Sequence, residues 1–67
     1  MYAGVNFKSK KAFKEAVAAG RKIGLYSPGF GVPKENGTEF VEGPWYPAPH
    51  SWYAIVEMKD GIVVKVR

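Results

Sequence analysis

The sequence contains no cysteine and a single histidine, His50, in 67 residues. Disulfide bonds and thiolate zinc sites are therefore excluded, and no metal or other cofactor is expected. Long apolar runs are also missing: the alanine-rich run at 16–19 is far too short to span a bilayer. Residues 1–14 hold no apolar core of signal-peptide length, so we expect a soluble cytoplasmic protein without a membrane segment.

The composition nevertheless predicts a folded chain. Hydrophobic residues make up 46% and aromatic residues 15% of the sequence, which is unlike a disordered tail. A chain of this length buries only about 60% of the surface that its unfolded form exposes. Without disulfides or a metal, its stability must come from good packing or from association with another chain. We predict one small domain over residues 1–67.

Local signals predict one helix and several strands. Ser9 is a good N-cap, residues 10–19 are rich in helix formers, and Gly20 stands where a helix would end in a left-handed residue. Extended segments are expected at 2–7, 22–26 and 38–41, and a hairpin at 52–67. The predicted fold is α+β: one N-terminal helix packed on a three- or four-stranded antiparallel sheet that ends in a C-terminal β-hairpin.

The hairpin suggests a particular register. A three-residue loop at 59–61 pairs Met58 with Ile62 and Val56 with Val64, and it makes one face entirely apolar. A two-residue loop at 60–61 would mix charged and apolar side chains on both faces, so the three-residue loop is predicted. The outer face then carries Tyr53, Ile55, Glu57, Val63, Lys65 and Arg67.

This outer face is too apolar to be fully solvated, and one short helix can cover only one side of a sheet. We therefore predict that it is an interface, either in a homodimer or with another protein. Binding energy in interfaces concentrates in aromatic and arginine side chains. The predicted partner-binding residues are Trp45, Tyr46, Tyr53, Ile55, Val63 and Arg67.

An aromatic and proline-rich stretch covers residues 43–53 and contains both tryptophans and two of the four tyrosines. One interpretation is a rigid platform that binds a base, a nucleotide or a protein partner. The other is that the rings close the edge of a small core. Trp52 is expected in the core, whereas both interpretations stay open for Trp45 and Tyr46.

Basic residues are concentrated around the helix. Residues 8–22 hold six basic side chains against the single acid Glu15, so this segment is net +5 while the other residues are net −1. Such a segment can bind phosphates, although a solvated helix face explains the same lysines. The candidate nucleic-acid or nucleotide contacts are Lys8, Lys10, Lys11, Lys14, Arg21 and Lys22.

Catalytic residue types are scarce, and no catalytic residue is predicted. His50 lies between Pro49 and Ser51, and sequence-adjacent serine and histidine side chains diverge in an extended chain. We therefore expect a non-catalytic protein.

Residues 6–20 (NFKSKKAFKEAVAAG) and 43–53 (GPWYPAPHSWY) together resemble small uncharacterised phage-encoded proteins. The resemblance offers no functional residue to transfer. It implies a viral accessory protein, made in an infected bacterium, that occupies a host factor, a defence component or nucleic acid. The expected function is thus a non-catalytic binding protein, with a basic nucleic-acid- or nucleotide-binding module as the alternative.

Overall fold

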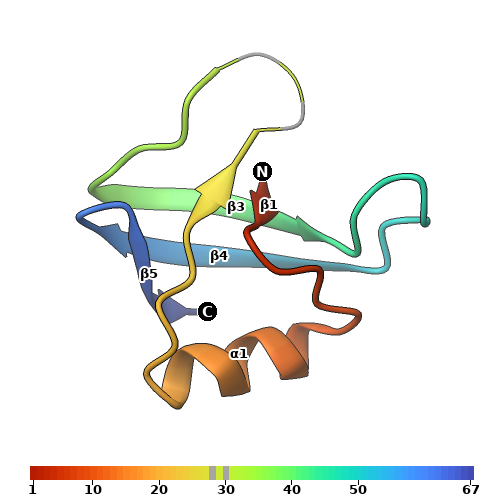
Figure 1. Cartoon of the computed structure of the whole chain (residues 1–67), viewed down its shortest axis with the longest axis horizontal. Helices are drawn as coiled ribbons and strands as arrows, with labels where there is room; N and C mark the ends of the chain where they lie inside the picture. Colours follow the sequence, from red (N-terminus) through yellow and green to blue (C-terminus); the bar gives the residue numbers. More distant parts are fainter. Residues whose placement is uncertain (28, 30) are drawn as a thin grey trace.

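The computed structural model describes residues 1–27, 29 and 31–67. Within these residues it contains one helix and two antiparallel sheets, so the predicted α+β class and the C-terminal hairpin are confirmed (Figure 1). No helix in this part of the chain has the length and hydrophobicity that a membrane crossing requires. The elements are β1 (Tyr2–Ala3), α1 (Lys10–Ala18), β2 (Leu25–Tyr26), β3 (Gly37–Gly43), β4 (Trp52–Lys59) and β5 (Ile62–Val66).

The helix begins and ends where the local signals predict. The Ser9 side chain accepts a hydrogen bond from the Ala12 amide at 3.1 Å and thereby caps the first turn. Gly20 has a φ of 86°, which is the left-handed conformation that closes a helix. The helix buries Phe13 and Ala16 and packs against β4 and β5.

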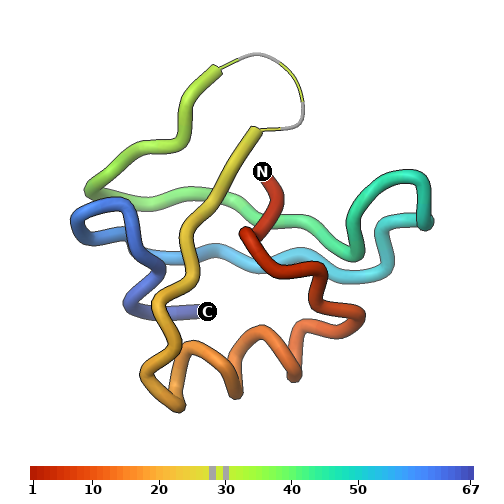
Figure 2. The backbone as a smooth tube through the Cα atoms, viewed as in Figure 1, coloured from red at the N-terminus to blue at the C-terminus, as the bar shows by residue number. Residues whose placement is uncertain are grey.

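The strands form a three-stranded sheet in the order β3-β4-β5 and a two-stranded sheet of β1 and β2. Two main-chain hydrogen bonds connect the three-stranded sheet to residues that precede β1 and β2. The Glu42 amide on β3 donates to the Met1 carbonyl at 2.9 Å, and the Val63 amide on β5 donates to the Ile23 carbonyl at 2.8 Å. The segment after the helix therefore runs beside β5 (Figure 2).

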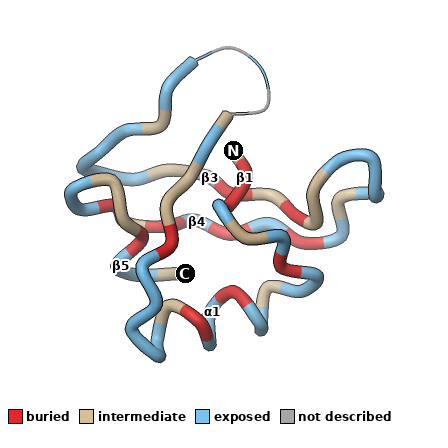
Figure 3. The backbone as a smooth tube through the Cα atoms, viewed as in Figure 1, coloured by how far each residue is buried: buried red, intermediate tan, exposed pale blue. Residues whose placement is uncertain are grey.

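The core lies between the helix and the inner faces of the strands. Buried and exposed residues alternate along β4, so one face of this strand points into the core and the other points outward (Figure 3). Phe13, Val41 and Val56 are fully buried. The Trp52 ring packs on Phe13 with 5.4 Å between ring centres, and its Nε1 donates to the Phe7 carbonyl at 3.0 Å. Trp52 is thus a core residue, as predicted.

The predicted hairpin register is wrong. The loop has two residues, Asp60 and Gly61, whose φ values of 52° and 78° suit a type I′ turn. Lys59 pairs with Ile62 and Met58 with Val63. Val63 is consequently 2% exposed and lies in the core, not on the outer face, whereas Val64 is 54% exposed.

A β-bulge explains how a two-residue loop still gives an apolar inner face. The register shifts between Glu57 and Met58, so that Glu57 pairs with Lys65 and Val56 with Val66. The extra residue on β5 returns Val66 to the side of Val56, which a regular ladder would not do. The predicted three-residue loop paired Val56 with Val64 and therefore placed Val63 and Val64 on the wrong sides of the sheet.

Candidate functional site

The outer face of the three-stranded sheet exposes three large apolar side chains. Phe40 is 65%, Tyr53 64% and Ile55 41% exposed. Phe40 on β3 lies directly opposite Ile55 on β4, and Tyr53 is two residues further along β4. These three side chains form one continuous apolar patch on the outer face.

Tyr53 and Ile55 were predicted on this face, but Phe40 was missed. Phe40 lies on β3, outside the C-terminal hairpin from which the outer face was predicted. The signal that would have found Phe40 is the alternation along residues 38–42, since a strand paired with β4 must contribute one residue in two to the same face.

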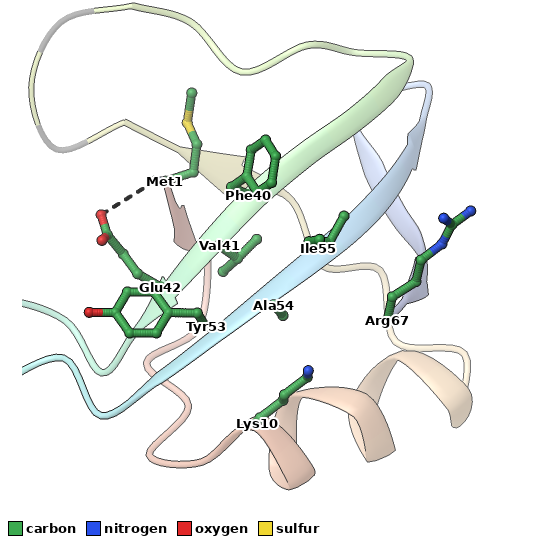
Figure 4. A pocket seen from close by; sticks show the side chains of 9 residues that line it. All are labelled: Met1, Lys10, Phe40, Val41, Glu42, Tyr53, Ala54, Ile55 and Arg67. Atoms are coloured by element: carbon green, nitrogen blue, oxygen red, sulfur yellow. Dashed lines mark ion pairs between the residues drawn. The ribbon is translucent and has the colours of Figure 1, made fainter.

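A shallow groove of about 710 Å³ lies over this patch (Figure 4). Lys10, from the first turn of α1, and Arg67, which follows β5, contribute to its lining. The groove therefore combines exposed aromatic rings with cationic side chains. Its lining residues are Met1, Lys10, Phe40, Val41, Glu42, Tyr53, Ala54, Ile55 and Arg67.

The carboxylates on the outer face already have partners. Glu57 contacts the Arg67 guanidinium at 3.0 Å and accepts hydrogen bonds from the Thr38 hydroxyl at 3.0 and 3.2 Å. Glu42 lies 3.6 Å from the Met1 amine and 3.4 Å from His50 Nδ1. Among the described residues, Arg67 is the one lysine or arginine with a carboxylate within 4 Å. The lysines bordering the sheet are therefore free to meet an anion.

The six residues of the predicted basic segment are spread along α1 and both of its flanks. Lys10, Lys11 and Lys14 lie on α1, Lys8 precedes it, and Arg21 and Lys22 follow Gly20 at the other end. Of these six residues, only Lys10 lines the main groove. Lys14 lines a second groove of about 200 Å³, together with Lys65 and the exposed Val64.

The aromatic loop at 43–51 is a separate part of the surface. Trp45 donates from Nε1 to the Ala3 carbonyl at 2.9 Å and from its amide to Asn6 Oδ1 at 2.9 Å. Its ring also meets the Tyr26 ring edge-on. These contacts fasten the loop to the N-terminal segment, while Tyr46 is 80% exposed. Neither Trp45 nor Tyr46 lines the groove.

Behind this loop lies a polar cluster of Tyr2, His50 and Glu42, which the sequence did not predict. The Tyr2 hydroxyl accepts a bond from the Tyr46 amide at 3.0 Å and lies 2.7 Å from His50 Nε2. All bonds are satisfied when the hydroxyl donates to Nε2 and the Nδ1 proton faces Glu42. The two hydrogen bonds of the Tyr2 hydroxyl hold the aromatic loop in place. Because Tyr2 is 4% exposed, its hydroxyl is not an accessible nucleophile.

Acidic and histidine side chains form no group that could hold a metal ion within residues 1–27, 29 and 31–67. The chain matches no protein-family model, and no curated protein or solved structure is significantly similar to it.

Proposed function

We propose that the chain is a non-catalytic binding module that holds a macromolecular partner on its outer face. The observation that carries this proposal is the continuous exposure of Phe40, Tyr53 and Ile55 at paired positions of β3 and β4. Single exposed apolar residues are ordinary, but a contiguous apolar patch is typical of an interaction surface.

The surroundings of His50 support a non-catalytic role. Its Nε2 is engaged by a buried tyrosine hydroxyl, and its Nδ1 faces Glu42, which also contacts the Met1 amine. A general base must reach the proton that it removes from a substrate. Both nitrogens of this imidazole are instead directed at the chain itself.

Capture from a bacterial lysate, with and without nuclease, tests which surface binds. The variant Phe40→Ala/Ile55→Ala removes two side chains from the outer face, and we expect it to lose the captured partner. Tyr46→Ala is the control, because Tyr46 is an aromatic residue outside the groove and is even more exposed than Phe40. Circular dichroism must show both variants folded. Loss of capture in Tyr46→Ala, with retention in Phe40→Ala/Ile55→Ala, would contradict the proposal and assign binding to the aromatic loop.

An exposed apolar patch of this kind can bind another protein, including a second copy of this chain. The homodimer form predicts that the wild type sediments as a dimer at micromolar concentration. Ile55→Asp should then give a monomer, since Ile55 is 41% exposed at the centre of the patch and an aspartate there would bring an uncompensated charge into the interface. A monomeric wild type excludes the homodimer in that range.

A further inference from the structure

We propose that the ligand of the outer face is single-stranded nucleic acid, with bases stacked on Phe40 and Tyr53 and phosphates held by the lysines that flank the sheet. This inference rests on the proposed function, because it names the partner of the same face. It differs from the sequence-based alternative, which assigned nucleic acid to the lysine-rich helix segment and the aromatic loop.

The first argument is the arrangement of the two rings. Phe40 faces Ile55, and Tyr53 faces Glu42, so the two aromatic residues are diagonal neighbours on one side of the sheet. Diagonal positions of this kind are roughly 7–8 Å apart. Successive bases of an extended strand can therefore each reach one ring. A duplex keeps its base faces stacked inside, so only a single strand can use such a platform.

The second argument is the presence of cationic side chains in both grooves. Lys10 and Lys14 are one helical turn apart on α1, and Lys65 and Arg67 are two residues apart at the end of the chain. Because α1 packs against β5, the four side chains lie along neighbouring elements. Lys10 and Arg67 line the main groove, and Lys14 and Lys65 line the smaller one. A phosphate backbone that follows both grooves would meet all four.

The third argument is that the acids of this face do not oppose an anion. Glu57 is paired with Arg67, and Glu42 contacts the Met1 amine and faces the His50 ring. Arg67 contacts Glu57 through its Nη2 nitrogen at 3.0 Å. Arginine has five N–H donors, so the others remain available to a phosphate. The ligand that fits this face is therefore anionic and carries flat rings.

Fluorescence anisotropy with labelled oligo-dT and oligo-rU of twelve nucleotides, and with a duplex of the same length, tests the inference at ~50 mM salt. We expect both single strands to bind and the duplex to bind at least tenfold more weakly. Tyr53→Ala or Phe40→Ala should weaken single-strand binding by roughly 5- to 100-fold, because each removes one stacking surface. Tyr46→Ala should leave it unchanged.

A salt series tests the path of the phosphates. Each lost phosphate contact lowers the slope of log affinity against log salt by about 0.7 for a single strand. Lys10→Gln/Lys65→Gln should therefore lower it by about 1.4. The matched control, Lys22→Gln/Lys34→Gln, makes the same charge change away from both grooves and should leave the slope near its wild-type value.

Several results would overturn the inference. Equal affinity for duplex and single strand, or no effect of Phe40→Ala and Tyr53→Ala, removes the stacking platform. If Lys10→Gln/Lys65→Gln and Lys22→Gln/Lys34→Gln lower the slope of log affinity against log salt equally, the phosphates do not follow the proposed path. No binding of any oligonucleotide, together with a nuclease-resistant partner that is lost in Phe40→Ala/Ile55→Ala, overturns the inference and leaves the proposed function standing. If Phe40→Ala/Ile55→Ala also still captures every partner that the wild type captures, the proposed function fails as well.

Discussion

Gly43 lies directly opposite Trp52 in the β3–β4 ladder, and the indole ring lies against its Cα. A methyl group at this position would overlap the indole ring of Trp52. Since Trp52 is 8% exposed and bonded to the Phe7 carbonyl, the ring has little room to move away. The glycine is therefore required by space and not by its backbone conformation, because its φ is not left-handed.

We predict that Gly43→Ala lowers the free energy of unfolding by about 1–3 kcal/mol, the usual cost of overpacking a core. Chemical denaturation monitored by tryptophan fluorescence measures the change. Gly29→Ala is the control, because a methyl group there would meet, beyond its chain neighbours, no atom of the described residues within 4 Å. Equal midpoints for Gly43→Ala and the wild type would mean that Trp52 does not pack on this glycine.

The Tyr2 hydroxyl connects both ends of the aromatic loop, through the Tyr46 amide and the His50 ring. Tyr2→Phe removes both hydrogen bonds and leaves the ring contacts with Tyr26 and His50 in place. We predict a loss of about 1–2 kcal/mol of stability, as expected for two hydrogen bonds around a buried hydroxyl. The His50 ring protons should also shift in the NMR spectrum, because Nε2 loses its partner.

Tyr26→Phe is the matched control for this prediction. The Tyr26 hydroxyl makes no hydrogen bond within the described part of the chain, while its ring contacts Tyr2 and Trp45. Its removal should leave both the stability and the His50 resonances nearly unchanged. Equal effects of the two substitutions would show that the hydroxyl of Tyr2 does not hold the loop.

At the scale of the elements, the helix could be predicted because its signals are local. Ser9 caps the first turn, and Gly20 takes the left-handed conformation that ends the last one. The hairpin register could not be predicted in the same way. Val63 and Val64 are both apolar, and the choice between them depends on the bulge and on the bond from Val63 to Ile23, forty residues away.

The same distinction applies to the candidate site. Tyr53 and Ile55 could be placed on one face because alternation along a single strand is local. Phe40 belongs to the patch because β3 pairs with β4, which brings it opposite Ile55. The contact of Tyr2 with His50 likewise joins residues 48 positions apart. Partners so distant in the sequence leave no local pattern, so only the fold reveals them.

The bulge makes a testable prediction about these two valines. Val63→Ala should cost about 2 kcal/mol, because Val63 is 2% exposed and two buried methyl groups are lost. Val64→Ala should change stability by less than about 0.5 kcal/mol, as is usual at an exposed position. Thermal denaturation of both variants measures the difference. The three-residue loop requires the opposite order, with Val64 buried, so a larger cost for Val64→Ala would restore the rejected register.

At the scale of the whole molecule, a chain of 67 residues without cysteine has no disulfide bond to stabilise its core, so contacts between the segments around the core must do so. Two of these contacts are main-chain hydrogen bonds: the Glu42 amide donates to the Met1 carbonyl, and the Val63 amide donates to the Ile23 carbonyl. Phe13, which is fully buried, is part of the core that these segments enclose. If the two-stranded sheet opened by itself, it would expose this core to water, which is costly for so small a protein.

We therefore predict that the Glu42 and Val63 amide protons exchange with solvent only through global unfolding, at the rate of the slowest amides of β4. Both protons are donors across the junction of the two sheets, so separate opening would release them first. Amide exchange measured at low denaturant concentrations distinguishes the two cases, because global unfolding exposes more surface and its free energy falls steeply with denaturant. The exposed Val32, in the loop before β3, is the reference for an amide that should exchange quickly. Faster exchange at Glu42 and Val63 than in β4, with a shallow denaturant dependence, would mean that the two-stranded sheet opens independently of the rest of the molecule.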